Sequence, residues 1–268
     1  MKRWIHIVFF MLLLLAACSG RFSRKAELNP GIHNTPPSSP PNRSKAEFVK
    51  NPEPDYLSLA NALIERGFYR VALVQLDEAR KKDHNNPQIY YLMGICHKAL
   101  GEFKRAEALF RKSLEKDPRY APAYSELGTL YDRKGDRKIA MTYYKKAIEI
   151  DPSKPEFFNN IGFSEIMSGD LKAAELHLLE SLKLDPGSLR TLNNLAFCYL
   201  KMGKEKKAVS ILKTVLPQDQ VYSNLGAMYE LQHNSGKAAE MYRKALTANP
   251  NLSKIRARLN HLTERTNH

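Results

Sequence analysis

The sequence contains little cysteine, no long hydrophobic run and a minority of acidic residues. Three cysteines in 268 residues exclude a fold built on disulfides. The apolar run near the N-terminus covers only residues 7–17, which is too short to cross about 30 Å of hydrocarbon. With 28 Asp+Glu against 42 Lys+Arg the net charge is +14, which permits an acidic partner, nucleic acid or an anionic membrane surface. A 43% hydrophobic content indicates a globular chain whose core comes from packing.

Motifs for catalysis and metal binding are also missing from the sequence. The eight histidines are scattered, and none forms a His-x-x-x-His pair beside a carboxylate suited to zinc. There is no nucleophile elbow and no glycine loop for phosphate or a dinucleotide, because the glycines recur singly. We therefore expect no metal, no cofactor and no enzymatic activity.

Residues 1–17 have the form of an export signal, since Lys2 and Arg3 precede the apolar run. The run ends in Ala16, Ala17 and Cys18, which is similar to the lipobox of bacterial lipoproteins. This resemblance implies cleavage before Cys18, acylation of Cys18 and a durable lipid anchor. The residue after the cysteine is a serine and not an aspartate, which in that family implies transport to the outer membrane. The alternative is an ordinary cleaved signal followed by a stray cysteine.

Residues 18–52 are expected to form a disordered tether. Seven of the fifteen prolines fall within residues 19–54, among Ser, Asn and charged residues, and such a composition cannot bury a core. Its excess of basic residues suits an anionic headgroup layer or a polyanionic cell-wall polymer, or is simply solvated. About thirty such residues at up to about 3.1 Å each would reach on the order of 90 Å.

A repeat occupies residues 53–252. Small residues recur at spacings of 34, 34, 34, 34 and 30, at Ala60, Gly94, Gly128, Gly162, Ala196 and Gly226. The period resembles that of the tetratricopeptide repeat (TPR) family. This resemblance implies an all-α fold, a right-handed TPR superhelix of about six helix-turn-helix repeats, with residues 253–268 as a capping helix and tail. The fifth repeat is four residues short near Pro217 and must turn differently.

Glycines and cysteines in this frame have structural interpretations. Glycine inside a helix costs about 1 kcal/mol relative to alanine, so the glycines among the small residues above predict close packing of the paired helix. Glycines at five helix ends, Gly67, Gly101, Gly135, Gly169 and Gly203, predict left-handed caps. Cys96 and Cys198 are three repeats apart, too far for a bridge. We expect buried, reduced thiols, with pairing between molecules as the alternative in an oxidising periplasm.

Binding is the remaining class of function. In the TPR family the first helix of each repeat lines an inner groove, and the matching residues here are uncharged and rich in Asn. We predict a peptide-binding groove that comprises Asn61, Tyr91, Ser125, Thr129, Asn159, Asn160, Phe163, Asn193, Asn194, Phe197 and Asn224. Asn side chains can hold the backbone of an extended peptide, and the two phenylalanines supply apolar pockets. Alternatively, some of these Asn residues cap helices or bond to neighbouring helices.

The carboxylate clamp of some TPR domains needs Lys and Arg in this groove. The candidates here are poorly placed for it, so a free C-terminal carboxylate is not the expected ligand. These candidates are Lys98, Arg133, Arg190 and Lys201.

An exported, lipidated chain of six TPR-like repeats resembles the lipoproteins that serve pilus machines. The nearest resemblance is to the TadD family of the tight-adherence (Flp) pilus. It is carried by the Asn-Asn-Ile-Gly run at residues 159–162 and the Asn-Asn-Leu-Ala run at residues 193–196. The next resemblance is to the type IV pilus secretin pilotins. It implies a non-enzymatic scaffold, lipid-anchored on the periplasmic side of the outer membrane, whose protein partner is a pilus secretin or another assembly subunit. The alternatives are an envelope adaptor that recruits peptidoglycan hydrolases and, if the chain is not exported, an RNA-binding protein.

Overall fold

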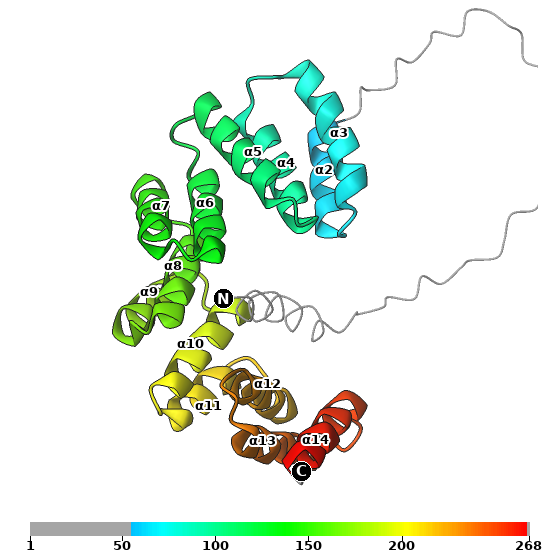
Figure 1. The fold of residues 1–268 in the computed structure, drawn as a ribbon, viewed down its shortest axis with the longest axis vertical. Coiled ribbons are helices and arrows are strands. Elements are labelled where there is room, and N and C mark those ends of the chain that lie inside the picture. The colour runs from blue at the N-terminus through cyan, green and yellow to red at the C-terminus, as the bar shows by residue number, and fades with distance from the viewer. Residues whose placement is uncertain (1–54, 267–268) are drawn as a thin grey trace, which may run out of the picture.

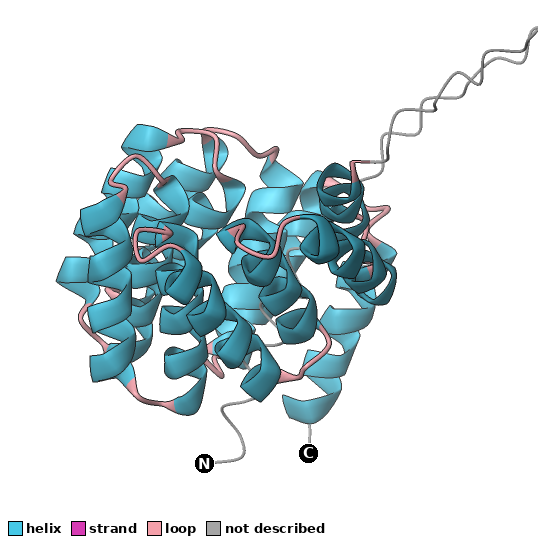
Figure 2. Cartoon of the chain, turned by 90° about the horizontal axis from the view of Figure 1, so that it is seen from above, coloured by secondary structure: helices cyan, strands magenta, loops and turns pink. Residues whose placement is uncertain are grey.

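The computed structural model describes residues 55–266 of the chain. This part consists of thirteen helices and contains no strand (Figure 2). None of these helices is both long and apolar enough to cross a membrane. The predicted export signal, Cys18 and the tether lie outside the described residues. The predicted all-α class is confirmed.

The helices form six antiparallel pairs, each with a first helix A and a second helix B, and every helix packs mainly against its neighbours along the chain. A last helix, α14 (Ser253–Thr266), closes the C-terminal end, so the prediction of six repeats and a capping helix is confirmed. The pairs are α2 (Tyr56–Glu65) with α3 (Tyr69–Lys82), α4 (Pro87–Ala99) with α5 (Phe103–Lys116), α6 (Ala121–Lys134) with α7 (Arg137–Ile150), α8 (Pro155–Ser168) with α9 (Leu171–Leu184), α10 (Leu189–Lys201) with α11 (Glu205–Lys213), and α12 (Gln218–Leu231) with α13 (Ser235–Ala248).

The stacked pairs form a superhelical arc (Figure 1). Helices α6, α8 and α12 lie on its inner side, and α7, α9 and α13 lie on its outer side. Helices A of successive repeats also contact one another, as α6 does with α8, α8 with α10 and α10 with α12. We call the side formed by the helices A the inner face.

Small residues on the helices A allow large residues of the helices B to approach. A Cβ added to Gly94 would lie 2.5 Å from the ring of Phe110, a distance at which one of the two must shift. The first repeat has Ala60 and Leu76 at the equivalent places, in one core cluster. The predicted close packing is confirmed, and it recurs for Gly128 against Tyr144, Gly162 against Leu178 and Gly226 against Tyr242.

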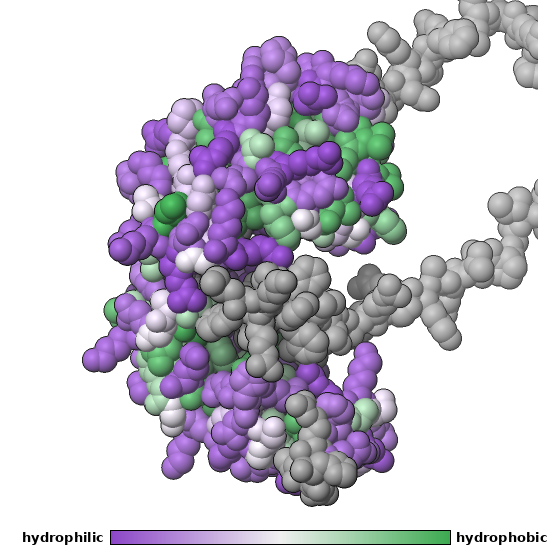
Figure 3. All heavy atoms as spheres, viewed as in Figure 1, coloured by the Kyte–Doolittle hydropathy of each residue, from purple (hydrophilic) through white to green (hydrophobic). Residues whose placement is uncertain are grey.

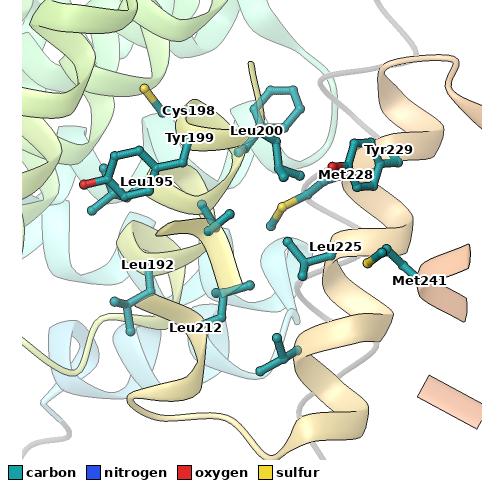
Figure 4. Packing of buried hydrophobic residues seen from close by; sticks show 14 of the residues in the cluster. Leu192, Leu195, Cys198, Tyr199, Leu200, Leu212, Leu225, Met228, Tyr229 and Met241 are labelled. Carbon is teal, nitrogen blue, oxygen red and sulfur yellow. The ribbon is translucent and has the colours of Figure 1, made fainter. Parts of the chain in front are cut away.

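The shortened fifth repeat has lost part of its helix B. Helix α11 has 9 residues, whereas α5 has 14. Pro217 is the N-cap residue of α12, so the chain re-enters the regular pattern directly after the deletion. Leu212 of α11 is fully buried among α10 and α12 in the core cluster that runs from α8 to α14 (Figure 4). The predicted irregular turn near Pro217 is confirmed.

The helices A end at residues whose backbone adopts the left-handed conformation. The five predicted glycines have φ between 74° and 89°, as a left-handed cap requires. In the sixth repeat the equivalent residue is His233, with φ 58°, and it is the one non-glycine residue with positive φ within residues 55–266. An L-residue in this conformation costs about 1–2 kcal/mol, so α12 ends under strain.

Both cysteines of the repeats are buried and free. Burial raises the pKa of the Cys96 and Cys198 thiols to about 11, so the reactive thiolate is scarce at neutral pH. The Cys198 Sγ also donates to the carbonyl of Leu171 at 3.4 Å. The predicted burial of both thiols is confirmed, and their reduced state stays a prediction.

Gly94→Ala is expected to lower the free energy of unfolding by about 1–3 kcal/mol, because the new Cβ meets the Phe110 ring. Chemical denaturation measures this loss. Adding Phe110→Leu recreates the Ala60 and Leu76 pair of the first repeat, so the double variant should be more stable than the sum of the single changes predicts. A Gly94→Ala variant stabilised by about 1 kcal/mol, as in an exposed helix, would contradict the close packing.

His233→Gly is expected to raise the free energy of unfolding by about 0.5–1 kcal/mol, because glycine adopts positive φ without the steric cost. The matched control is Gly101→Ala at the equivalent place, where an added Cβ meets nothing within 4 Å, so only the backbone strain is introduced. That control should lose about 1 kcal/mol. Equal melting temperatures for all three proteins would refute the strain at His233.

Candidate functional site

The predicted binding residues are spread along the inner face, from α2 to α12, and do not gather in one pocket. Their exposure separates them into two groups. Seven are half-buried, namely Asn61, Tyr91, Thr129, Asn160, Phe163, Asn193 and Asn224. Four are buried, namely Ser125, Asn159, Asn194 and Phe197, all with 8% or less of their surface exposed.

Asn side chains of successive repeats bond directly to one another. In each bond the amide of one repeat donates to a side-chain oxygen of the repeat before it, so the bonds tie the helices A together. We call this set the Asn ladder. Its bonds are Asn160 Nδ2 to Ser125 Oγ at 3.0 Å, Asn194 Nδ2 to Asn159 Oδ1 at 2.7 Å, and Asn224 Nδ2 to Asn193 Oδ1 at 3.0 Å.

The Asn ladder changes the role expected for three of the predicted residues. Ser125, Asn159 and Asn194 are buried within it, so a peptide on the inner face cannot reach them directly. This outcome matches the alternative in which Asn side chains bond to neighbouring helices. Their contribution is to hold the repeats in register, because buried amides need hydrogen-bond partners.

The half-buried members keep some capacity for a ligand. An amide offers two donor hydrogens and one acceptor oxygen, and in the ladder Asn224 uses one donor and Asn193 uses its oxygen. Asn61 and Thr129 bond instead to carbonyls of their own helices, those of Leu57 at 3.1 Å and Glu126 at 2.8 Å. The peptide-binding role therefore stays a prediction for the half-buried residues.

The aromatic residues of the inner face differ in their surroundings. Phe163 is half-buried. Tyr91 packs its ring against Phe110 and Tyr120, with ring centroids 5.9 Å and 5.5 Å away, and burial raises the pKa of its hydroxyl. Phe197 is 5% exposed and belongs to the core. Phe163 is thus the better placed of the two predicted phenylalanines for a ligand.

Positively charged side chains on the inner face are engaged within the chain. Lys98 forms an ion pair with Glu126 of the next repeat. The guanidinium of Arg133 lies 3.8 Å from the centroid of the Phe103 ring, and Lys201 lies 5.6 Å from that of Phe197. Three of the four cations considered for a carboxylate clamp therefore make contacts within the chain.

Arg190, the fourth of these cations, is exposed beside a pocket of about 140 Å³ between α8 and α10. Glu156 and Asp185 line the same pocket. Its volume is below the roughly 300–1,000 Å³ of small-molecule sites. Within residues 55–266, no group of three or more His, Cys, Asp or Glu side chains is arranged to hold a metal ion.

Two carboxylates that no sequence motif marks lie between the helices, Glu165 buried and Asp132 half-buried. Asp132 accepts from Tyr144 and from Ser164 of the next repeat, both at 2.9 Å, and burial raises the pKa of Asp132 despite these bonds. Glu165 is 4% exposed and pairs with His177 Nδ1 at 2.8 Å, a hydrogen bond that raises the pKa of His177. No motif marks either carboxylate, because their burial depends on the neighbouring helices.

A charged network on Glu107 links α5 to α6. Its carboxylate accepts from Lys134 at 2.6 Å, from Arg111 at 3.0 Å and from Tyr131 at 2.9 Å. Burial raises the pKa of Glu107, but these hydrogen bonds outweigh it and lower the pKa from 4.5 to about 2. The network therefore stabilises the stacking of the second and third repeats when Glu107 is ionised.

Asn194→Ala is expected to lower the free energy of unfolding by about 1–3 kcal/mol, because it leaves the Asn159 oxygen buried without its cross-repeat donor. Asn61→Ala is the matched control and should change it by at most about 0.5 kcal/mol, since Asn61 is half-buried and bonds only its own helix. Denaturation of both variants, with the Asn159→Ala and Asn194→Ala double variant, gives the coupling energy. Equal losses for Asn194→Ala and Asn61→Ala would contradict a structural Asn ladder.

Glu107→Gln is expected to lower the free energy of unfolding at pH 7 by about 1 kcal/mol. Because the folded pKa of about 2 lies below the unfolded value of about 4.3, the stabilisation is complete above the unfolded pKa and is lost as the pH falls towards the folded one. Denaturation curves between pH 7 and pH 2.5 should therefore converge for the two proteins. A difference that is constant with pH would contradict the network.

Comparisons with known proteins extend these observations. Models of the tetratricopeptide repeat match residues 88–153, 165–229 and 219–252, together more than half of the chain. The mouse protein named tetratricopeptide repeat protein 12 is 38% identical over 64 residues, which cover 24% of this chain. The chain spans only 9% of that relative's length.

Solved structures share the fold. PilW, a widely conserved type IV pilus biogenesis factor, matches with a TM-score of 0.62 and 21% identity, over 76% of this chain and 96% of PilW. PilF of Pseudomonas aeruginosa matches with a TM-score of 0.58 and 17% identity, over 77% of this chain and 96% of PilF. A tetratricopeptide repeat protein of Parabacteroides merdae matches with a TM-score of 0.56 and 20% identity, over 78% of this chain and 83% of that protein. At such identities the likeness concerns the fold alone. The chain belongs to the tetratricopeptide repeat family.

Proposed function

We propose that the chain is a lipid-anchored scaffold that binds an extended segment of a protein partner on its inner face. TPR repeats are a protein-interaction fold, and the inner face is where the helices A present their side chains. The observation that carries the proposal is the row of uncharged, half-buried side chains on consecutive helices there, with Asn160 and Phe163 on α8 and Asn193 on α10.

The chemistry of this row suits a particular kind of segment. An extended backbone has one unpaired N–H and C=O per residue, and Asn side chains supply both complementary groups. The Phe163 ring offers an apolar contact for an alternate side chain of the segment. Three of the four clamp candidates, Lys98, Arg133 and Lys201, are engaged within the chain, so we expect recognition to rest mainly on hydrogen bonds and apolar contact.

The partner that we propose is a secretin or another assembly subunit of a pilus machine. Three observations support this. The lipobox pattern at Cys18 suits an anchor at the outer membrane, where such machines have their exit pore. The runs at residues 159–162 and 193–196 resemble the TadD family. The described fold matches PilW, a type IV pilus biogenesis factor, over 96% of its length.

Site-specific photo-crosslinking in the native host tests the binding face. The photoreactive residue p-benzoylphenylalanine replaces Phe163 in one variant and Leu176 in the control. Leu176 is 69% exposed on α9, so the control reports the outer side. We expect position 163 to crosslink to a pilus subunit at least about five-fold more strongly than position 176. Equal labelling of the same protein from both positions would overturn the inner face as the binding surface.

Fractionation of membranes tests the anchor and the partner class. The wild type should sediment with the outer membrane and Cys18→Ala should not, because acyl chains supply the anchor. Secretin crosslinks from position 163 in the outer-membrane fraction would support the pilus role. Crosslinks dominated by peptidoglycan hydrolases would replace it with the adaptor role, and a soluble wild type would refute the lipid anchor.

A further inference from the structure

The first described repeat exposes four large apolar side chains, whereas the other repeats have at most one at the corresponding outer places, such as Ile139 and Leu176, which are 44% and 69% exposed. Leu59, Phe68, Val71 and Val74 are 45%, 55%, 50% and 57% exposed, and hydrophobic residues are visible over α2 and α3 in Figure 3. We call these four residues the N-terminal patch. Solenoid ends need a polar outer face for solubility, so an uncovered apolar end is unusual.

The equivalent residues of later repeats are mostly covered by a preceding repeat or are polar or small. Leu127 and Leu195 stand at the place of Leu59, and each is fully buried because a repeat precedes it. At the three outer places of the patch the second repeat has Glu102, Arg105 and Ala108, and the fifth has Lys204, Lys207 and Ser210. The first repeat alone has three large apolar residues there, Phe68, Val71 and Val74.

The C-terminal end of the solenoid, in contrast, is covered by a polar helix. There α14 turns Leu259 and Leu262 into the core and exposes Lys254, Arg256 and Asn260. It supplies the polar cover that a solenoid end requires. Among the described residues, which begin at Asp55 directly before α2, no such cover lies on the N-terminal end.

We propose that residues 44–50 of the same chain dock on the N-terminal patch and act as its cap, with Phe48 and Val49 as the buried side chains. Between Ser19 and Pro54 these two are the one adjacent pair of large apolar residues. Ser44 followed by Glu47 has the form of a capping box, a helix-start pattern. The proposal does not depend on the partner assigned to the inner face.

The patch lies within reach of this segment. The start of α2 lies beside the end of α3, because the Lys82 Nζ is 4.7 Å from the centroid of the Tyr56 ring. From Lys82 back to Val74 is about 12 Å along α3. Val49 precedes Asp55 by six residues, which span up to about 20 Å when extended. The segment can therefore cover Val74 and its neighbours without strain in the connection.

The size of the patch favours this tethered segment over a second copy of the chain. Four side chains that are half exposed offer apolar surface on the order of 300 Å². A stable dimer buries about 800 Å² on each partner. A covalently linked segment needs far less contact, because its effective concentration at the patch is in the millimolar range.

Photo-crosslinking of the full chain in membranes tests the cap. With p-benzoylphenylalanine in place of Val74, we expect crosslinks within one chain to residues 44–50, identified by mass spectrometry. Phe48→Asp with Val49→Asp should reduce their yield at least about five-fold. The matched control, Leu28→Asp with Ile32→Asp, adds the same charge farther from α2 and should leave the yield unchanged.

Three results would overturn the proposal. They are crosslinks from position 74 to a second copy of the chain, crosslinks to lipid or to another protein, and an intrachain yield that the two double variants reduce equally. The absence of any crosslink from position 74, while the same residue at position 163 is shown to be photoactive, would also overturn it. The substitutions in residues 28–49 lie outside the described helices and Val74 is exposed, so equal melting temperatures verify that the fold is intact.

Discussion

The contact between a small residue of helix A and a large residue of helix B sets the geometry of this solenoid. At Gly94 the partner is the ring of Phe110, and an added Cβ would lie only 2.5 Å from it. Helices can approach so closely only where one of them lacks a side chain, so this contact fixes the separation within a repeat. In the first and fifth repeats the partner is a leucine and the small residue is an alanine, whereas in the fourth repeat Gly162 faces Leu178.

The stacking of successive helix pairs determines which side chains of the inner face are buried and which stay accessible to a ligand. Successive helices A come close enough for Asn194 to bond Asn159 at 2.7 Å, and the same relation recurs on both sides of this pair. The buried amides serve the register between repeats. The half-buried side chains beside them, such as Phe163 and Asn193, are held in place by this frame. A rigid row of this kind lowers the entropy that binding would otherwise cost.

The repeat period predicted the fold well because each role depends on local spacing. The number of repeats, the left-handed glycine caps, the capping helix and the shortened turn before α12 all follow from residues that lie within one repeat of each other. The burial of Asn159, Asn194 and Phe197 depends instead on contacts between repeats, so residue type alone could not reveal it. One signal was present, since Asn160 and Asn194 each follow their acceptor by 35 residues. The buried Glu165 and the half-buried Asp132 carried no comparable signal.

Hydrogen–deuterium exchange of the chain, alone and co-purified with its membrane partner, tests the inner-face account most directly. The account predicts that the partner slows exchange in the helices A around Phe163 and Asn193, namely α8 and α10, and leaves the outer helices α7 and α9 unchanged. Protection confined to α7 and α9, with α8 and α10 exchanging as in the free chain, would contradict it.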